Sequence, residues 1–507
     1  MFVRKKKNRS GSVTVVVVDK SRGQFREVHN FGTSSDMHKV EELCKEAKSW
    51  ILNHDGQEVL DLWPEERLVS QTEIFNSITA IRQDVPYRIL EQIYDSVGFD
   101  KVGDKILKDL AIARVCCPKS KVATVDYMRQ YWGEAYQYQS IYRYLDALYN
   151  KKKEQVLQIS VDHTRKILGG AITVAFYDVT TLYFESFRED NLRAPGFSKD
   201  GKTAETQVVL GLLVSRDGYP LAYSLFNGSQ FEGRTMIPIV DDFIQRYDIK
   251  DFVLVADSGL MSKANVELLR NAGYKYVIGA RIRNEEKHLK EWIVGLHKAD
   301  KAIYERKRTN GDRLIVSYSD KRAEKDKYNR ERGVQRLQQA YKSGRITKDK
   351  INRRGYNKFL SISNDVQVSI DMDKVADDSK WDGWKGYITN TNIKAAECIA
   401  QYHGLWVVER SFRISKGTLD MRPMFHFTEK RIEAHVCLCF VALKLYKEFE
   451  RLLRVMCWDL SVDKTLEIAK TISTVTLTLS NGETSSQTLF LTDDQRRLMP
   501  LMKTFGL

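Results

Sequence analysis

The chain has 507 residues, 42% of them hydrophobic, which is too long for a single compact core and predicts roughly two to four domains. It carries 81 Lys and Arg against 67 Asp and Glu, a net charge of +14 that favours a polyanionic partner. Nucleic acid is the first candidate for this partner and an anionic membrane surface the second. The charge is equally consistent with an ordinary, mildly basic cytosolic protein. No apolar run reaches membrane-spanning length, and the start "MFVRKKKNRS" lacks a signal-peptide core, so we expect a cytoplasmic protein.

The seven cysteines include no Cys-x-x-Cys pair, which favours a reducing compartment. His435, Cys437 and Cys439 fall in the apolar run "RIEAHVCLCFVALKLY". Small buried side chains explain these residues better than zinc ligands do.

Residues 1–60 predict a β/α lead, with the β-prone runs "SVTVVVVDK" and "QFREVHNFG" followed by a helix over 36–52. The basic residues from Arg4 to Lys7 suit a DNA backbone, and a frayed tail is the plain alternative.

Residues 70–150 form the next segment, where apolar residues at three- and four-residue spacing predict helices throughout from Asn76 to Tyr149. Basic side chains such as Arg129 and Arg143 alternate with aromatic ones. This pattern fits a helical DNA-binding module, and equally a bundle whose aromatic residues form the core.

From residue 171 the period changes to that of strands. The runs "AITVAFYDV", "QVVLGLLVS" and "PLAYSLFN" predict three strands, with Asp217-Gly218 as a hairpin turn between the last two. A helix over 235–247, the strand "DFVLVADSG", a helix over 263–272 and the strand "YKYVIGARI" follow. This order predicts a layered α/β core, and residues 165–283 form its first part.

Residues 284–385 interrupt that core as a basic insertion. The stretch 321–358 holds 14 Lys and Arg and 4 Asp and Glu, which suits either a solvated helical face or a DNA-contacting surface. Residues 386–453 are mostly helical and form the second part of the core. The C-terminal region, 454–507, contains a hairpin signalled by Asn481-Gly482.

Three carboxylates suggest metal chemistry. Asp178 and Asp257 each stand at the polar end of a buried strand, and adjacent strands would bring them together. Two such carboxylates repel each other unless cations lie between them, and Mg²⁺ is the ion suited to carboxylate and phosphate oxygens. A third carboxylate from a helix completes a two-metal site for in-line phosphoryl displacement, with ions ~3.5–4 Å apart. Glu409 is the candidate and Glu185 its rival. Each aspartate taken singly is also an ordinary cap of the turn after a strand.

The segments "FYDVTTLYFES", "VLVADSGLMS" and "YHGLWVVERSFRISKGTLDMRP", in this order, resemble the DDE transposases of bacterial insertion sequences, in the insertion-sequence-four-like superfamily. The resemblance covers residues 170 to 450. Tyr402, Glu409 and Lys416 fall on the spacing of the family's third motif, while Leu405 replaces its arginine. On one continuous helix these three residues, seven apart, would share a face.

The resemblance implies a ribonuclease-H-like mixed sheet flanked by helices, interrupted by an insertion of largely β character. The pattern of "RAEKDKYNRERGVQRLQQAYKSG" predicts a helix there instead. The implied activity is cut-and-paste DNA transposition: Mg²⁺-dependent cleavage at transposon ends and strand transfer into target DNA. Asp178, Asp257 and Glu409 would be the catalytic residues holding two Mg²⁺ ions, with Mn²⁺ as a substitute. The implied partners are transposon-end DNA, target DNA and a second copy in a synaptic homodimer, in a bacterial or archaeal cytoplasm at the nucleoid.

The resemblance also implies DNA contacts. Tyr402 and Lys416 would hold a terminal phosphate, and a tryptophan would stack on a flipped base. The remaining candidates for DNA contacts are Trp381, Trp384, Trp406, Arg410, Arg413, Arg422, Lys199 and Lys202. The two lysines equally fit a solvated loop. A metal-dependent nuclease or resolvase on the same fold, and a non-catalytic DNA-binding regulator, are the alternative functions.

Overall fold

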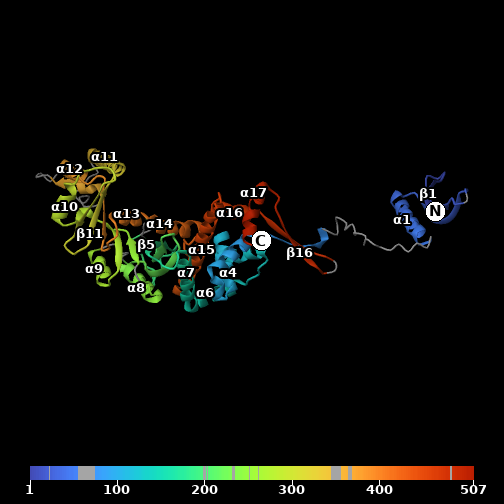
Figure 1. Cartoon of the computed structure of the whole chain (residues 1–507), viewed down its shortest axis with the longest axis horizontal. Coiled ribbons are helices and arrows are strands. Elements are labelled where there is room, and N and C mark those ends of the chain that lie inside the picture. Colours follow the sequence, from blue (N-terminus) through green and yellow to red (C-terminus); the bar gives the residue numbers. More distant parts are fainter. Residues whose placement is uncertain are drawn as a thin grey trace. The chain divides into compact units, whose positions relative to one another are not determined.

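The computed structural model describes residues 1–21, 23–54, 75–197, 201, 204–230, 234–249, 252–260, 262–343, 355–362, 368–479 and 482–507. The chain divides into two compact units, Met1–Ser77 (unit 1) and Ile78–Leu507 (unit 2) (Figure 1). No helix among these described ranges is long and apolar enough to cross a bilayer.

Unit 1 is a three-stranded antiparallel sheet with one helix. The strands β1 (Phe2–Lys7), β2 (Val13–Asp19) and β3 (Arg26–Ser34) lie in the order β1-β2-β3, followed by α1 (Met37–His54). Val15 and Val17 of β2 form a small core with Val40 and Ala47 of α1. Strands followed by a helix are what the sequence predicts for this segment.

Unit 2 is built on an eight-stranded mixed sheet in the order β10-β11-β14-β9-β8-β5-β6-β7. The strands are β5 (Val174–Tyr183), β6 (Gln207–Ser215), β7 (Pro220–Asn227), β8 (Val253–Ala256), β9 (Lys275–Ala280), β10 (Ile303–Lys307), β11 (Arg313–Tyr318) and β14 (Trp384–Thr389). The β5–β8 and β8–β9 pairs are parallel and the other pairs antiparallel. Three antiparallel strands followed by two parallel ones form the ribonuclease-H-like core that we expected.

Local signals explain the connections in this core. Gly218 lies in the turn between β6 and β7 with a φ of +83°, a backbone conformation that favours glycine. The antiparallel pairing of β6 with β7 confirms the predicted hairpin. The helices α8 (Met236–Tyr247) and α9 (Lys263–Asn271) connect β7 to β8 and β8 to β9, within one residue of the predicted ranges.

The insertion extends the core sheet. Its strands β10 and β11 join β14, which pairs antiparallel with β9, and a hairpin forms from β12 (Leu360–Ile362) and β13 (Val368–Ile370). Its helices are α10 (Lys287–Val294), α11 (Asp320–Lys342) and α12 (Met372–Ser379). The insertion is therefore mixed, and α11 confirms the helix that the sequence pattern predicts.

A helical bundle surrounds the long helix α15 (Glu429–Val455), which is buried along most of its length. Contacts with it come from α3 (Val85–Val97), α4 (Lys105–Cys116), α6 (Tyr138–Lys151), α7 (Lys153–Ile167) and α16 (Val462–Ala469), while α5 (Lys121–Tyr127) packs on α4 and α6. Segments far apart in sequence thus share one core (Figure 1).

The prediction of helices throughout from Asn76 is wrong over residues 78–82, where β4 (Ile78–Arg82) is a strand. The residues Ile78, Thr79 and Ile81 are β-branched, and β4 pairs with β15 (Ser473–Thr478) near the C-terminus. β15 also pairs with β16 (Thr484–Leu489), which confirms the predicted hairpin, although Asn481 lies outside the described residues. The chain ends in α17 (Asp493–Arg497) and α18 (Met499–Thr504).

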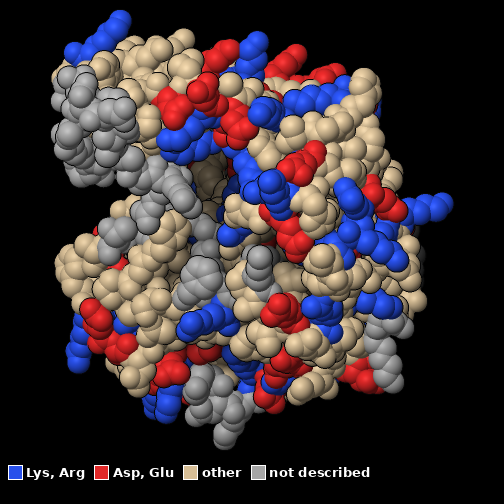
Figure 2. Space-filling view, turned by 90° about the vertical axis from the view of Figure 1, so that its left-hand side faces the viewer, with Lys and Arg blue, Asp and Glu red and all other residues tan. Residues whose placement is uncertain are grey.

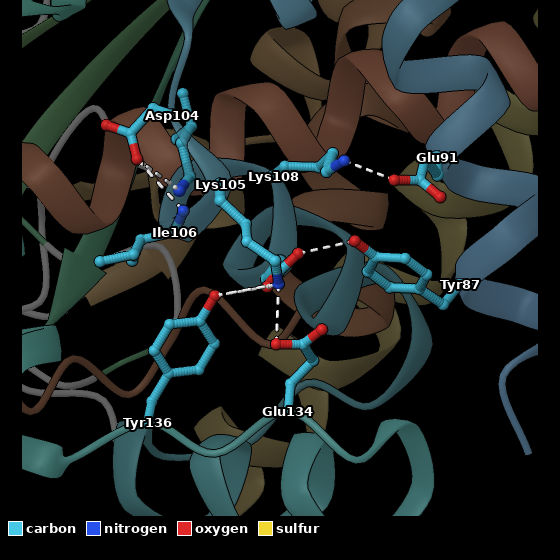
Figure 3. A network of polar contacts seen from close by, with 10 residues as sticks. Tyr87, Glu91, Asp104, Lys105, Ile106, Lys108, Glu134 and Tyr136 are labelled. Carbon is cyan, nitrogen blue, oxygen red and sulfur yellow. Dashed lines mark hydrogen bonds and ion pairs between the residues drawn. The ribbon is translucent and has the colours of Figure 1, made fainter. Parts of the chain in front are cut away.

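A buried carboxylate holds the bundle together. Asp109 of α4 has no exposed surface and accepts hydrogen bonds from Tyr87 Oη (2.8 Å), Tyr136 Oη (2.5 Å) and Lys105 Nζ (2.6 Å). Lys105 also pairs with Glu134 at 2.8 Å (Figure 3). Because a buried charge is costly unless it is paired, this network fixes α3, α4 and the segment before α6 relative to one another.

Candidate active site

Strand register places two of the predicted carboxylates side by side. In the parallel β5–β8 pair Tyr177 lies opposite Ala256. Asp178 directly follows Tyr177, and Asp257 directly follows Ala256. Neighbouring strands are about 4.8 Å apart, so the two aspartates start from adjacent positions. Asp257 directly follows β8, as predicted. The prediction for Asp178 needs correction, because β5 continues to Tyr183 by pairing with β6.

Glu409 lies on α14 (Trp406–Arg413), which packs against β5 and β6. Its side chain is exposed. The third carboxylate therefore comes from a helix that lies on the strand of Asp178, as the sequence hypothesis requires.

The prediction of one continuous helix through this motif is wrong. α13 (Ala395–His403) ends before α14 begins, and Lys416 lies on a π-helical turn over 414–418. Gly404 between the helices lies directly on β5, where a Cβ atom would come within 2.5 Å of Phe176 Cζ. Tyr402 therefore lies on α13, Glu409 on α14 and Lys416 on the π-helical turn that continues α14, and not on one regular α-helix. Leu405, at the position of the family's arginine, is buried beside Gly404.

Tyr402 contacts Asp257 directly. Its hydroxyl donates a hydrogen bond of 2.6 Å to Asp257 Oδ1, and the Gly259 N–H donates one of 3.2 Å to Oδ2. Burial raises the pKa of Asp257, but the hydrogen bonds from Tyr402, Gly259 and Ser258 outweigh it and hold the pKa below its ordinary value. The carboxylate is therefore ionised at neutral pH, which metal binding requires. Burial and this carboxylate also raise the pKa of Tyr402, so its proton stays on.

Lys385 of β14 is a site residue that sequence reasoning missed. Its ammonium lies 4.5 Å from the centroid of the Tyr402 ring. Burial and Arg322 lower the pKa of Lys385, whereas Asp257 and Glu409 act in the opposite direction. Lys385 thus lies in the electrostatic range of both carboxylates. No local signal marks it, because only the pairing of β14 with β9 brings it to this place.

A cavity of about 730 Å³ opens beside Asp257. Its cationic lining residues are Arg281, Arg283, Arg322, Arg330 and Lys385. Figure 2 shows the end of unit 2 that carries the insertion, where Lys and Arg side chains border a hollow in the surface. Asp326, Asp378 and Asp382 line the cavity as well, where they form ion pairs with Arg322, Arg283 and Arg330. The lining therefore carries only a slight excess of cations, to which a phosphate backbone could bind.

The three predicted tryptophans have different surroundings. Trp381 lines this cavity, is partly exposed and lies 6.0 Å from the Arg283 guanidinium. Trp384 also lines it but is only 3% exposed, with its ring 5.1 Å from that of Tyr318. Trp406 is 56% exposed and lines a second cavity of about 470 Å³. Trp381 therefore combines exposure with a place beside Asp257.

The other predicted cationic residues are dispersed. Arg410 forms an ion pair with Glu450 at the second cavity, and Arg413 is exposed at the end of α14. The guanidinium of Arg422 lies 5.7 Å from the ring centroid of Tyr183, and Lys416 is partly buried. Lys199 and Lys202 lie outside the described residues.

The three carboxylates are donors that suit a hard cation, but their side chains do not form a complete metal-binding group in this structure. Among the described residues, no three His, Cys, Asp or Glu side chains form a group that could hold a metal ion. Asp178 and Asp257 offer adjacent carboxylate oxygens of the kind Mg²⁺ prefers. Glu409 comes from the neighbouring helix, with Lys385 near both Asp257 and Glu409. The chemistry of these carboxylate donors therefore fits a divalent metal ion.

Comparison with known proteins identifies the family of this chain. A family model described as "Transposase DDE domain" matches residues 169–445, more than half of the chain. The chain therefore belongs to the DDE-domain transposases. It is an enzyme of phosphoryl transfer in DNA transposition, and enzymes of this family depend on divalent metal ions.

Solved structures of two transposases are similar at low identity. One is piggyBac transposase in a synaptic complex with hairpin DNA, at 8% identity over 76% of this chain and 70% of that chain, with a TM-score of 0.35. Another is Mos1 transposase in a paired-end complex with the left transposon end, at 8% identity over 31% and 53%, with a TM-score of 0.16. No curated protein matches the chain.

Proposed function

We propose that this transposase cuts DNA at the ends of its own element and joins the freed ends to target DNA, using Asp178, Asp257 and Glu409 as ligands of two Mg²⁺ ions. The observation that carries the proposal is the β5–β8 register, which puts two aspartates on adjacent strands beneath the helix of Glu409. Mn²⁺ can replace Mg²⁺ in such an all-carboxylate site.

The metal pair would activate a water for attack on the phosphodiester and stabilise the leaving 3′ oxygen. The protein's own groups prepare this chemistry. Tyr402 holds Asp257 in one orientation and keeps it ionised. Lys385 offers a cation to the carboxylates or to an incoming phosphate, and Trp381 offers an aromatic surface to an unpaired base beside the cavity.

The finer assignment is to the insertion-sequence-four-like superfamily, in a bacterial or archaeal cell. The spacing of Tyr402, Glu409 and Lys416 supports it. We further propose that residues 70–150 and the basic insertion 284–385 contact DNA, with Lys416 and Arg413 close to the reacting strand. Two copies would hold the two ends in a synaptic homodimer.

Strand transfer separates this proposal from a nuclease of the same fold. The full chain is incubated with precleaved element ends, supercoiled plasmid and Mg²⁺, and joined products are resolved on a gel. We expect joining by the natural chain and none by Asp178→Asn. Nicking without joining would favour the nuclease or resolvase. Undiminished joining by Asp178→Asn, Asp257→Asn and Glu409→Gln would show that these carboxylates have no catalytic role.

A further inference from the structure

Unit 1 carries a surface that the catalytic site does not use. Helix α1 packs on one face of its sheet, through Val15 and Val17 of β2. Because side chains alternate along a strand, Thr14, Val16 and Val18 belong to the opposite face. Their direct partners on β1 are Lys6, Arg4 and Phe2, in that order. We call this opposite side the open face.

The open face combines cations with aromatic rings. The Arg4 guanidinium lies 5.3 Å, and the Lys20 ammonium 5.1 Å, from the ring centroid of Phe25. Phe25 contacts Phe2 edge to face at 6.2 Å. Phe2 is 42% and Phe25 58% exposed, whereas Val16 below them is buried. The long side chains thus form an exposed layer over a small apolar floor.

Charge is distributed unevenly between the two sides of unit 1. Residues 1–34, which form the sheet, contain eight Lys and Arg and two Asp and Glu. Residues 37–54, which form α1, contain three of each. By the same alternation Lys5 and Lys7 lie on the α1 side of the sheet, whereas Arg4, Lys6 and Lys20 lie on the open face, where Lys6 forms an ion pair with Glu27. The open face therefore keeps a net positive charge while the helix is neutral, which points to an anionic partner for this face.

We propose that the open face of unit 1 binds duplex DNA independently of the catalytic site, with the β1–β2 hairpin lying in the major groove. A two-stranded ribbon fits a groove about 12 Å wide, and sheets that read DNA in this way are known. Arg4 and Lys20 contact phosphates. Thr14 of β2, whose hydroxyl oxygen lies 2.7 Å from that of Thr33 of β3 at the other end of the face, is placed to contact base edges.

The test compares two double variants of the full chain that each remove two exposed cations from unit 1. Arg4→Ala/Lys20→Ala changes the open face, and Lys45→Ala/Lys48→Ala changes α1. Binding to a fluorescent duplex is measured by anisotropy at several salt concentrations, in EDTA so that no cleavage intervenes. Circular dichroism confirms that both variants are folded.

We expect the open-face variant to bind duplex DNA about tenfold more weakly, with a salt slope reduced by roughly one to two, because each phosphate contact contributes about 0.9. The α1 variant should bind within about twofold of the natural chain. Equal losses in both variants, or no loss in either, would overturn the proposal. So would a defect of the open-face variant confined to anionic phosphatidylserine vesicles or to single-stranded RNA. Strand transfer of precleaved ends in the same preparations reports on the catalytic site separately.

Discussion

Replacing Tyr402 by Phe removes one hydroxyl and leaves the ring in place. The lost interaction is the 2.6 Å hydrogen bond to the ionised Asp257. Hydrogen bonds to charged groups contribute about 1.5–3 kcal/mol, and each ~1.4 kcal/mol corresponds to a tenfold change in affinity. Loss of a group that orients a metal ligand typically weakens metal binding about 10- to 100-fold. We therefore expect the Tyr402→Phe variant to need about 10 to 100 times more Mg²⁺ for end cleavage than the natural chain does.

The assay is the rate of end cleavage as a function of Mg²⁺ concentration, at several pH values. Tyr402 lowers the pKa of Asp257, so its removal raises that pKa and lets protons compete with metal at higher pH. The acid limb of the rate profile should therefore move to higher pH. The control is Tyr387→Phe, whose ring contacts Tyr402 at 5.0 Å. An Mg²⁺ requirement within about twofold of that of the natural chain, or a lower requirement, would refute the reasoning.

Three further outcomes are expected. Lys385→Met should bind Mn²⁺ about fivefold more tightly in calorimetry, because a competing cation worth ~1 kcal/mol is removed, and weaker binding would contradict this. Asp109→Ala should lower the free energy of unfolding in urea by about 3–5 kcal/mol. Asp126→Ala, which removes the more exposed ion pair with Arg129, should lower it by less than ~1 kcal/mol, and similar losses in both variants would refute the network's role. Glu448 is buried, and although burial raises its pKa, hydrogen bonds from His163, Arg451 and Tyr219 lower it to about 2 from 4.5. It should therefore contribute roughly 3 kcal/mol above pH ~4.5 that is lost as the pH falls towards ~2, and Glu448→Gln should flatten this part of the stability profile.

Much of the catalytic core follows from local patterns. The alternation in β6 and β7, the Asp217-Gly218 turn and the helices α8 and α9 are short-range features, and the sequence predicts them within one residue. The strand β5 is also predicted, but it begins three residues and ends four residues later than its pattern indicates. Asp257 directly after β8 belongs to the same class. These elements depend on side-chain period and turn chemistry, which are visible in a single sequence.

Features that depend on distant contacts were beyond such reasoning. The break between α13 and α14 reflects the contact of Gly404 with Phe176, and the strand β4 exists through its pairing with β15. Lys385 reaches the site through strand pairing across the insertion. A helical period at Tyr402, Glu409 and Lys416 does not reveal that α13 ends at His403 and α14 begins at Trp406, because the contact of Gly404 with β5 is not visible in a single sequence.

The central claim is that Asp178, Asp257 and Glu409 together hold two divalent ions. The most direct measurement is the number of Mn²⁺ ions bound per protomer, by electron paramagnetic resonance, in the full chain with precleaved end DNA. We expect two ions in the natural chain, and fewer in Asp178→Ala, Asp257→Ala and Glu409→Ala. Unchanged binding of two ions in all three variants would contradict the account.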